Sequence, residues 1–359
     1  MNCIPFSPDE MIPRGTFRNL VGKELPLLAT PVSPRENYLA ALRGKKPLWL
    51  PMFSDCKKFM PRFIGENPIR GAVFETEPFS RENLTGGTDM FGVTWVFQPH
   101  VGGSTVKPGN PVITEAAELD TKIVWPDPAQ WDWAGSAEKN KKFLNTNFMR
   151  CTTIFTGFFE RLISLMDFEN AAVAMIDEDD KEYVHRFFDR LCGVYETMIR
   201  NYKKYFDLDL IEFHDDWGSQ RAPTLSLDTV REMIVPYLKR IVDCCHSCGM
   251  VFEMHSCGCV GPLTPAMIEA GVDAWAPQRS ANDTCAIYET YGDKISIGIS
   301  CPLPPNAPEE EYDAWLEGFV ESYLDRPNLR TPYLFDMRTP LRFRETAYAM
   351  TRKKFCGSL

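Results

Sequence analysis

The second half of the chain alternates between short apolar runs and longer segments in which apolar residues recur every three or four positions. The short runs are typical of buried β-strands and the longer segments of amphipathic α-helices. The predicted strands span 208–213, 250–254, 272–276, 294–298 and 332–335. The predicted helices span 226–248, 262–270, 282–291, 308–324 and 341–355. Strict alternation with short links predicts a parallel sheet, because neighbouring parallel strands need a crossover connection.

The first half of the chain has a less regular pattern. Prolines interrupt residues 1–45, which we interpret as an irregular arm with one helix at 35–43. The proline-flanked apolar run at 47–53 predicts a buried first strand. Glycine and proline are dense between 80 and 115, which predicts a hairpin-like insertion. The further elements predicted in this half are strands at 91–97, 111–114 and 151–156 and a long amphipathic helix at 181–204.

Together these patterns predict an α/β fold of the (β/α)8 TIM-type. Residues 1–45 form its N-terminal extension, and residues 46–359 form one barrel that carries the insertion at about 80–115. A doubly wound open sheet would carry a G-x-G-x-x-G turn after its first strand, and the sequence has none there. A barrel also accommodates a chain of 359 residues as one unit.

Composition excludes several classes of protein. The chain is 44% hydrophobic and 25% charged, which is ordinary for a globular protein with a large core. Its net charge of -10 argues against nucleic-acid binding, since phosphate neutralisation needs clustered Lys and Arg. There is no signal-peptide pattern and no apolar stretch of about 18 residues, so we expect a cytoplasmic protein without a membrane segment. We expect the 12 cysteines to be free thiols or metal ligands.

Polar side chains follow five successive predicted strands, where the active residues of β/α barrels gather. These strand-end groups are His214 to Arg221, His255 to Cys259, Gln278 with Arg279, Ser300 with Cys301, and Asp336 with Arg338. Candidates for binding the substrate are Trp217, Gln220, Gln278, Arg279 and Arg338, with Asp89 of the glycine-rich insertion. Asp89 fits a turn residue equally well.

The tetrapeptide His-Ser-Cys-Gly occurs twice, in two different settings. The first copy, His246 to Gly249, lies in the last turn of a predicted helix, where His favours the helix dipole and Cys is commonly buried. The second copy, His255 to Gly258, leaves a buried strand and enters a loop at the functional end of the barrel. We therefore assign a structural role to the first copy and chemistry to the second.

His255 and Cys257 are two residues apart and can project toward the same side. Imidazole nitrogen and thiolate sulfur are both zinc ligands, and a catalytic zinc site uses three protein ligands and one open position. Cys301, at the end of a neighbouring strand, is the preferred third ligand. Weaker candidates for this position are Cys259, Asp336 and Glu253. The alternative is a hydrogen-bonded His and an inert Cys at the rim of the barrel.

His214, Asp215 and Asp216 are candidate catalytic residues. Histidine titrates near neutral pH, and adjacent carboxylates tune it, so this group is suited to proton transfer or to orienting a substrate. The aromatic ring of Trp217 and the amide of Gln220 add groups that are suited to ligand binding. The alternative is a helix N-cap with solvated acidic residues.

As a set, these motifs resemble the uroporphyrinogen decarboxylase superfamily. The resemblance extends from about Lys45 to Lys354, is most specific between Glu212 and Pro277, and implies a (β/α)8 fold. The motifs that carry it are Asp215 to Gln220, Pro236 to Arg240, His255 to Gly258, and Gly271 to Ala274.

The resemblance favours one branch of this superfamily. True uroporphyrinogen decarboxylases carry an early Arg-Gln-Ala-Gly-Arg motif, whereas this chain reads Met52-Phe53-Ser54-Asp55-Cys56-Lys57-Lys58 at that point. Corrinoid-dependent methyltransferases bind zinc through a His-x-Cys pair, which His255 and Cys257 match, and a later Cys. In thiol-methylating members that Cys follows the last strand, where Asp336 stands here. Either Cys301 or Asp336 replaces it, or the zinc is bound differently, or no metal is retained.

The resemblance implies a zinc-assisted methyltransferase that moves a methyl group to or from a corrinoid protein. Its small-molecule partner would be a methyl donor or acceptor, as in O-demethylase systems or in the methylation of a thiol or tetrahydrofolate. The resemblance also implies that the protein forms a homodimer. One alternative is a metal-independent decarboxylase or lyase that acts on another carboxylated substrate, for which Arg221, Arg279 and Arg338 would supply cationic groups. A non-catalytic ligand-binding barrel is the third reading.

Overall fold

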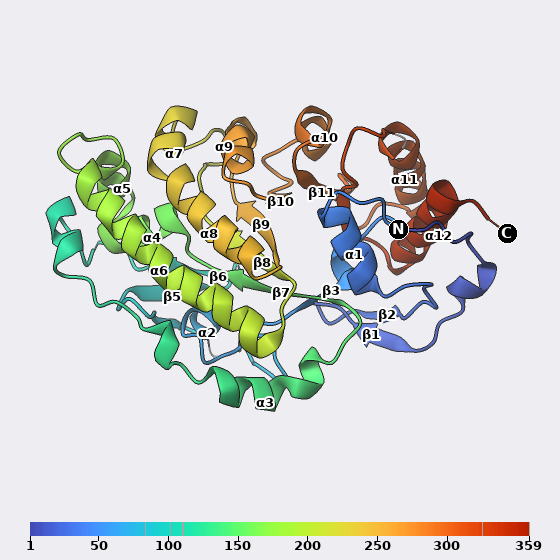
Figure 1. Ribbon diagram of the computed structural model, residues 1–359, viewed down its shortest axis with the longest axis horizontal. Helices are drawn as coiled ribbons and strands as arrows, with labels where there is room; N and C mark the ends of the chain where they lie inside the picture. The colour runs from blue at the N-terminus through green and yellow to red at the C-terminus, as the bar shows by residue number, and fades with distance from the viewer. Residues whose placement is uncertain (83, 101, 110, 325, 359) are drawn as a thin grey trace. The chain divides into compact units, whose positions relative to one another are not determined.

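The computed structural model describes residues 1–82, 84–100, 102–109, 111–324 and 326–358 (Figure 1). Within it the chain forms two compact units. The first comprises Met1–Lys57, Thr146–Arg150 and Asp273–Leu359, and the second comprises Lys58–Asn145 and Cys151–Val272. The division into an arm at 1–45 and one barrel at 46–359 stays a prediction.

The second unit contains parallel strands that follow one another in the chain. Strand β8 (Leu210–His214) pairs with β7 (Met149–Ile154) on one side and with β9 (Val251–Ser256) on the other. The crossover between β7 and β8 consists of α4 (Phe158–Met166), α5 (Phe168–Ala174) and α6 (Lys181–Phe206). The crossover between β8 and β9 consists of α7 (Leu227–Met233) and α8 (Val235–Ser247). These strands and helices confirm the alternation predicted from the sequence.

The long helix α6 is amphipathic and packs beside α8 (Figure 1). It buries one aromatic and aliphatic stripe and exposes its charged face, which is the pattern of a helix covering a sheet. Helix α8 ends before Gly249, whose φ of +74° is the left-handed conformation of a glycine cap. The remaining helices of this unit are α2 (Glu66–Ile69), α3 (Trp133–Leu144) and α9 (Thr264–Glu269), with short 3-10 turns at Ala116–Asp120, Pro128–Gln130 and Gly261–Leu263.

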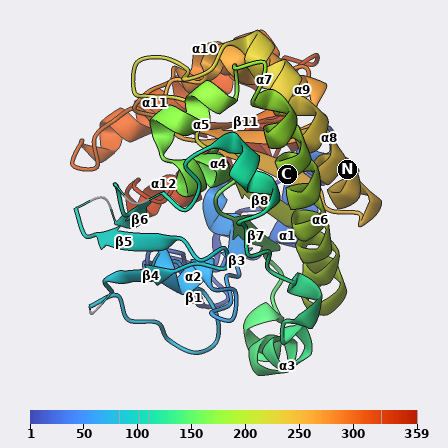
Figure 2. The same ribbon diagram turned by 90° about the vertical axis from the view of Figure 1, so that its left-hand side faces the viewer.

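The predicted insertion is an antiparallel sheet of three strands (Figure 2). Its central strand β5 (Thr94–Gln98) pairs with β4 (Gly86–Thr88) and β6 (Gly103–Val106). The strand predicted at 111–114 is wrong, since residues 111–114 form no regular element. Ile113 is nevertheless fully buried, and its backbone N–H donates to the Leu165 carbonyl rather than to a strand.

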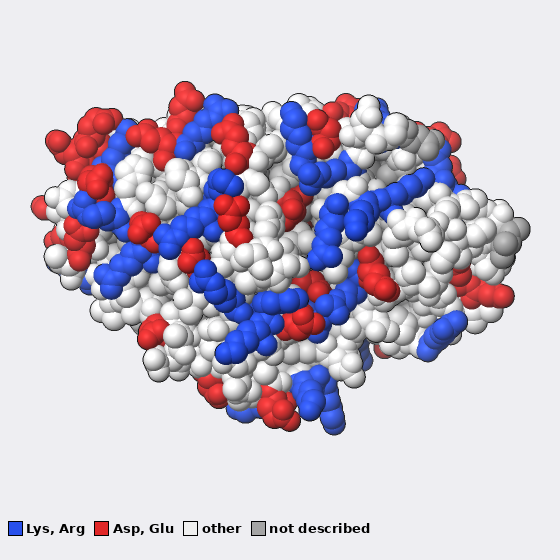
Figure 3. Space-filling model, viewed as in Figure 1, with Lys and Arg blue, Asp and Glu red and all other residues white. Residues whose placement is uncertain are grey.

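Charged residues of both signs are interspersed over α6 and α8 on the face in Figure 3. The ion pairs between these two helices include Arg240 with Asp189 at 2.8 Å and with Glu196 at 2.7 Å. Such half-exposed pairs contribute little to stability, because water screens them and the side chains lose freedom. They solubilise this face rather than hold the fold together.

The first unit contains a second parallel set. Strand β11 (Ser296–Ser300) pairs with β10 (Ala274–Pro277) and β12 (Tyr333–Phe335). The helices of this unit are α1 (Pro34–Leu42), α10 (Thr284–Tyr291), α11 (Glu309–Tyr323) and α12 (Leu341–Cys356), with short 3-10 turns at Pro8–Met11 and Phe53–Asp55. An antiparallel pair, β1 (Thr16–Arg18) with β2 (Glu24–Pro26), lies in the N-terminal arm. The helix predicted at 35–43 and the strands and helices predicted between 272 and 355 are therefore confirmed.

The first predicted strand, at 47–53, is wrong. Leu48, Trp49 and Leu50 are buried as expected, but they are not in a strand. The side chain of Asn37 accepts from Leu48 N–H at 2.7 Å and donates to the Trp49 carbonyl at 2.9 Å, so it replaces strand pairing. Met52 forms a single bridge to Leu334, and a short strand β3 (Cys56–Lys58) follows.

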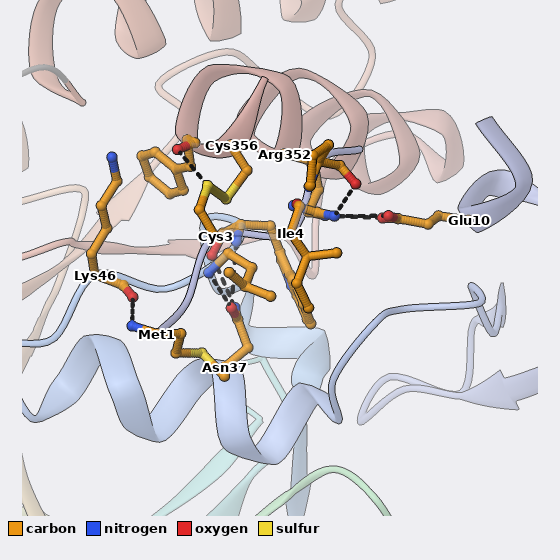
Figure 4. Close-up of a disulfide and its surroundings, with 12 residues drawn as sticks. Met1, Cys3, Ile4, Glu10, Asn37, Lys46, Arg352 and Cys356 are labelled. Carbon is orange, nitrogen blue, oxygen red and sulfur yellow. Dashed lines mark hydrogen bonds and ion pairs between the residues drawn. A yellow bond between two sulfur atoms is a disulfide. The ribbon is translucent and has the colours of Figure 1, made fainter. Parts of the chain in front are cut away.

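A disulfide between Cys3 and Cys356 ties the N-terminal arm to the last helix (Figure 4). The expectation of free thiols is wrong for this pair and holds for the other ten cysteines. Fully buried Arg352 reinforces the contact: it donates to the Ile4 carbonyl at 3.0 Å and to the Glu10 carboxylate at 2.7 Å. The arm is thus fixed at its first residues, although most of it lacks regular structure.

The predicted fold class, an α/β fold of the TIM-barrel type with an N-terminal extension and an antiparallel insertion, is confirmed. Among the residues that the structure describes, no helix combines the length and apolarity needed to cross a bilayer.

Candidate metal centre

Two histidines lie side by side at the carboxyl ends of β8 and β9. The register of this parallel pair places His214 directly opposite His255, and their ring centroids are 4.7 Å apart. Side chains opposite each other in a parallel pair point to the same face of the sheet. The same register brings together Glu212 and Glu253, two residues earlier in each strand.

Asp216 and Cys257 complete this group from the loops that follow the two strands. The backbone N–H of Cys257 donates to Oδ1 of Asp216 at 2.6 Å, and Nε2 of His214 lies 3.0 Å from the same oxygen. The Cys257 Sγ lies 3.5 Å from Nε2 of His255 and 3.9 Å from Nε2 of His214. Within the described residues, one ligand atom from each of these four side chains lies within 4.8 Å of all the others.

The spacing of these atoms suits zinc. Zinc–nitrogen, zinc–oxygen and zinc–sulfur bonds of about 2.0–2.3 Å place the ligands of a tetrahedral site about 3.3–3.8 Å apart. The sulfur–nitrogen distances of 3.5 and 3.9 Å and the nitrogen–oxygen distance of 3.0 Å bracket this range. The donor types are also those that zinc accepts. His214, Asp216, His255 and Cys257 would therefore hold the metal that the sequence predicts.

The charges around His214 favour a cation at this place. Burial disfavours a charged imidazole, but the carboxylates of Glu160 and Asp216 outweigh it and hold the pKa of His214 well above its usual range. Although burial opposes its ionisation too, hydrogen bonds from His214 and Cys257 N–H keep the pKa of Asp216 below its usual range. Burial raises the pKa of the Cys257 thiol, and His214 partly offsets this. The group thus combines the ionised carboxylate of Asp216 with two side chains, His214 and Cys257, whose protons a metal ion can displace.

The loop that carries Cys257 is fixed by a close backbone approach. Gly258 has a φ of +88°, and a Cβ there would lie 2.3 Å from the Gly218 carbonyl oxygen. Gly249, the glycine of the other His-Ser-Cys-Gly copy, has open space around the corresponding position. Only the second copy requires its glycine for tight packing, which agrees with the different roles predicted for the two copies.

Asp215 is not a member of this group. Its side chain is fully buried, and its two oxygens accept from Phe159 N–H at 3.2 Å, Glu160 N–H at 2.8 Å and Trp217 Nε1–H at 2.9 Å. Burial and the Glu160 charge raise its pKa to about 7. These contacts give Asp215 a structural role at the start of α4, and its direct part in catalysis stays a prediction.

We expect the two adjacent aspartates to have separable effects. Asp215→Ala should lower the free energy of unfolding by about 2 kcal/mol, because it leaves buried N–H donors without acceptors. Asp216→Asn should weaken zinc binding more than Asp215→Ala does, because it removes a ligand charge. Urea denaturation of the metal-free proteins and zinc titration would measure the two effects. A pattern in which Asp215→Ala alone weakens zinc binding would contradict this assignment.

The remaining candidates of this unit lie outside the group of four. Trp217 is fully buried, and Gln220 is exposed. Asp89 is buried in a network in which it accepts from Phe91 and Val93 N–H, Trp95 Nε1–H and Arg161, the last at 2.5 Å. Cys259 and Glu253, the weaker third-ligand candidates, are also absent from the group. Substrate binding by Asp89, Trp217 and Gln220 stays a prediction.

Five candidates belong to the first unit, and the group of four includes none of them. Cys301 is buried, and its carbonyl accepts from Arg279 at 2.6 Å. Asp336 is buried and accepts from Ser54 N–H at 2.9 Å. Gln278 is half-buried and Arg338 is exposed. The assignment of Cys301 as a ligand, and of Gln278, Arg279 and Arg338 as substrate-binding residues, stays a prediction.

Asp336 gives a prediction for pH dependence. Burial raises its pKa to about 6, and bonds from Ser54 only partly offset this. As pH rises from about 4, the Asp336 carboxyl ionises first in the unfolded chain, where it has its ordinary pKa. The free energy of unfolding therefore falls until about pH 6, where Asp336 also ionises in the folded protein. Asp336→Asn cannot ionise, so between pH 4 and 8 its stability should rise by about 2 kcal/mol relative to wild type. Urea midpoints across this range would test it, and a constant difference would contradict it.

Sequence reasoning missed two residues that line the His214 side of the group. Glu160, the third residue of α4, places Oε2 at 3.8 Å from Nδ1 of His214. Arg70 places Nη2 at 3.9 Å from Oε1 of Glu160 and lies over the Trp95 ring at 3.9 Å. The end of β7 was the available signal for Glu160, because it supplies one more strand end beside β8. No sequence pattern indicated Arg70.

Comparisons with known proteins support the fold. No family model matches the sequence, and a search of curated proteins finds no relative. A solved methyltransferase from Methanosarcina mazei is similar over 90% of this chain and 99% of its own, with a TM-score of 0.58 and 15% identity. D-allulose 3-epimerase from Methylomonas sp. covers 63% of this chain and 80% of its own, with a TM-score of 0.36 and 10% identity. The first likeness shows a shared fold, and the second is too weak to carry an argument.

Proposed function

We propose that the protein is a zinc-dependent methyltransferase that moves a methyl group to or from a corrinoid protein. The observation that carries this proposal is the convergence of His214, Asp216, His255 and Cys257 at the ends of two adjacent parallel strands. The likeness in fold to a methyltransferase over 90% of the chain supports it. The corrinoid partner and the zinc come from the resemblance of the strand-end motifs to corrinoid-dependent methyltransferases.

The four residues of the group would have two roles: three would hold the metal, and one would lie where a substrate can approach it. Zinc in this place would act as a Lewis acid toward a thiol sulfur or a methoxy oxygen. His255 would hold it from β9, Cys257 from the loop that follows β9, and His214 from β8. The Asp216 side chain is 33% exposed, against 15% for His214, so Asp216 is the donor at the side that a substrate can reach.

A transfer assay in both directions tests the proposal. Protein purified without chelator should contain zinc and should demethylate methylcobalamin in the presence of a small thiol or tetrahydrofolate. In the other direction, it should form methylcobalamin from cob(I)alamin and an aryl methyl ether if it serves an O-demethylase system. Removal of zinc should stop whichever reaction is found. Failure of the zinc-loaded protein in both directions would contradict the proposed function.

A further inference from the structure

We infer that Glu160 is a positioning residue of the metal centre. Its carboxylate accepts a hydrogen bond from the Nδ1–H of His214 and thereby turns Nε2 of this histidine toward the metal. The inference rests on the proposed function and adds a residue outside the group of ligands. It concerns the orientation and basicity of a ligand rather than contact with the substrate.

Two buried atoms face each other at this point. Oε2 of Glu160 and Nδ1 of His214 are 3.8 Å apart. Each is inaccessible to solvent, and neither has a hydrogen-bond partner in the part of the chain that the structure describes. Buried polar atoms almost always have a hydrogen-bond partner, because an unpaired one loses its hydration and gains no hydrogen bond in exchange. A movement of less than 1 Å would join this donor and acceptor in a normal hydrogen bond of about 2.9 Å.

The other ring nitrogen of His214 already points at the ligand group. Nε2 lies 3.0 Å from Asp216 Oδ1 and 3.9 Å from Cys257 Sγ, whereas Nδ1 faces Glu160. A neutral imidazole that binds a metal through Nε2 carries its proton on Nδ1. That proton needs an acceptor, and metal-bound histidines usually donate it to a carboxylate or carbonyl group. Glu160 supplies the carboxylate.

Glu160 is itself fixed from two sides. Its backbone N–H donates to Asp215 Oδ1 at 2.8 Å, which ties the first turn of α4 to the residue after His214. On the other side, Arg70 Nη2 lies 3.9 Å from its Oε1. Arg70 is in turn held by the Trp95 ring and by a bond from its Nη2 to Thr156 Oγ1 at 2.5 Å. A carboxylate held in this way is suited to fix a ring orientation.

A graded pair of substitutions tests this role. Glu160→Leu removes the acceptor, and Glu160→Gln keeps an oxygen but removes the charge. Zinc affinity, measured by competition with a chromophoric chelator, should fall by about 100-fold for Glu160→Leu and by about tenfold for Glu160→Gln. The visible spectrum of the cobalt(II)-substituted protein should shift in the same order. Glu169→Gln, an exposed glutamate on the neighbouring helix α5, is the matched control and should change neither.

The outcomes separate this inference from the proposed function. If wild-type protein binds zinc but both Glu160 variants retain its affinity and cobalt spectrum, the inference is wrong and the metal centre stands. If wild-type protein binds neither zinc nor cobalt, the proposed function fails together with the inference. Should Glu160→Leu not fold, the tenfold loss and spectral shift of Glu160→Gln decide the question. Lower stability without a change in affinity or spectrum would show a merely structural role.

Discussion

Cys257→Ser should lose stoichiometric zinc binding, whereas Cys248→Ser should retain it. Cys257 supplies the sulfur of the candidate group, and zinc prefers thiolate to hydroxyl, so we expect affinity to fall by about 100-fold or more. Cys248 stands in the same His-Ser-Cys-Gly sequence at the end of α8, outside this group. Metal analysis of the purified proteins, followed by competition titration, would measure the difference.

The two variants are matched in composition, because each replaces the cysteine of one of the two His-Ser-Cys-Gly copies. Equal zinc content in the wild type and Cys257→Ser would contradict the assignment of Cys257. Loss of zinc from Cys248→Ser alone would show that the metal binds at the end of α8. His255→Ala and His246→Ala extend the same comparison to the histidine of each copy.

Arg161→Leu should lower the free energy of unfolding by about 3–5 kcal/mol, the usual cost of removing one member of a buried ion network. The Arg161 side chain is fully buried and binds both Asp89 and Glu66, which are themselves buried. Without the arginine, the two carboxylates face each other in a site that excludes water. Burial already raises the pKa of Glu66 despite the compensating charge of Arg161.

Arg240→Leu is the control for this prediction. Arg240 pairs with Asp189 and Glu196 but is 39% exposed, so its removal should cost less than about 1 kcal/mol. Urea denaturation of the metal-free proteins would compare the two. Equal losses for Arg161→Leu and Arg240→Leu would mean that the buried network does not stabilise the fold.

The repeating part of the fold could be predicted from the sequence because local pattern determines it. The apolar run at 250–254 and the amphipathic segment at 226–248 are confirmed as β9 and α7–α8. The run at 47–53 has the same apolar character, yet it forms no strand, because Asn37 takes up its backbone groups. That contact joins residues 12 positions apart, and no local pattern reveals it.

The candidate site was predicted in part for the same reason. Strand ends can be located from the sequence, which predicts His255 and Cys257 as ligands and His214 and Asp216 as catalytic residues. The register of β8 and β9 decides that all four ligand atoms converge, and register depends on pairing between distant segments. Glu160 was missed because it lies inside the first turn of α4, six residues beyond the end of β7.

X-ray absorption at the zinc edge of the purified protein tests the central claim most directly. The four-residue group predicts one sulfur at about 2.3 Å and nitrogen or oxygen ligands at about 2.0–2.1 Å. This pattern should lose its sulfur contribution in Cys257→Ser. Two sulfur ligands would instead require a second cysteine, such as Cys301 or Cys259. A protein without zinc, or zinc without any sulfur ligand, would contradict the proposed centre.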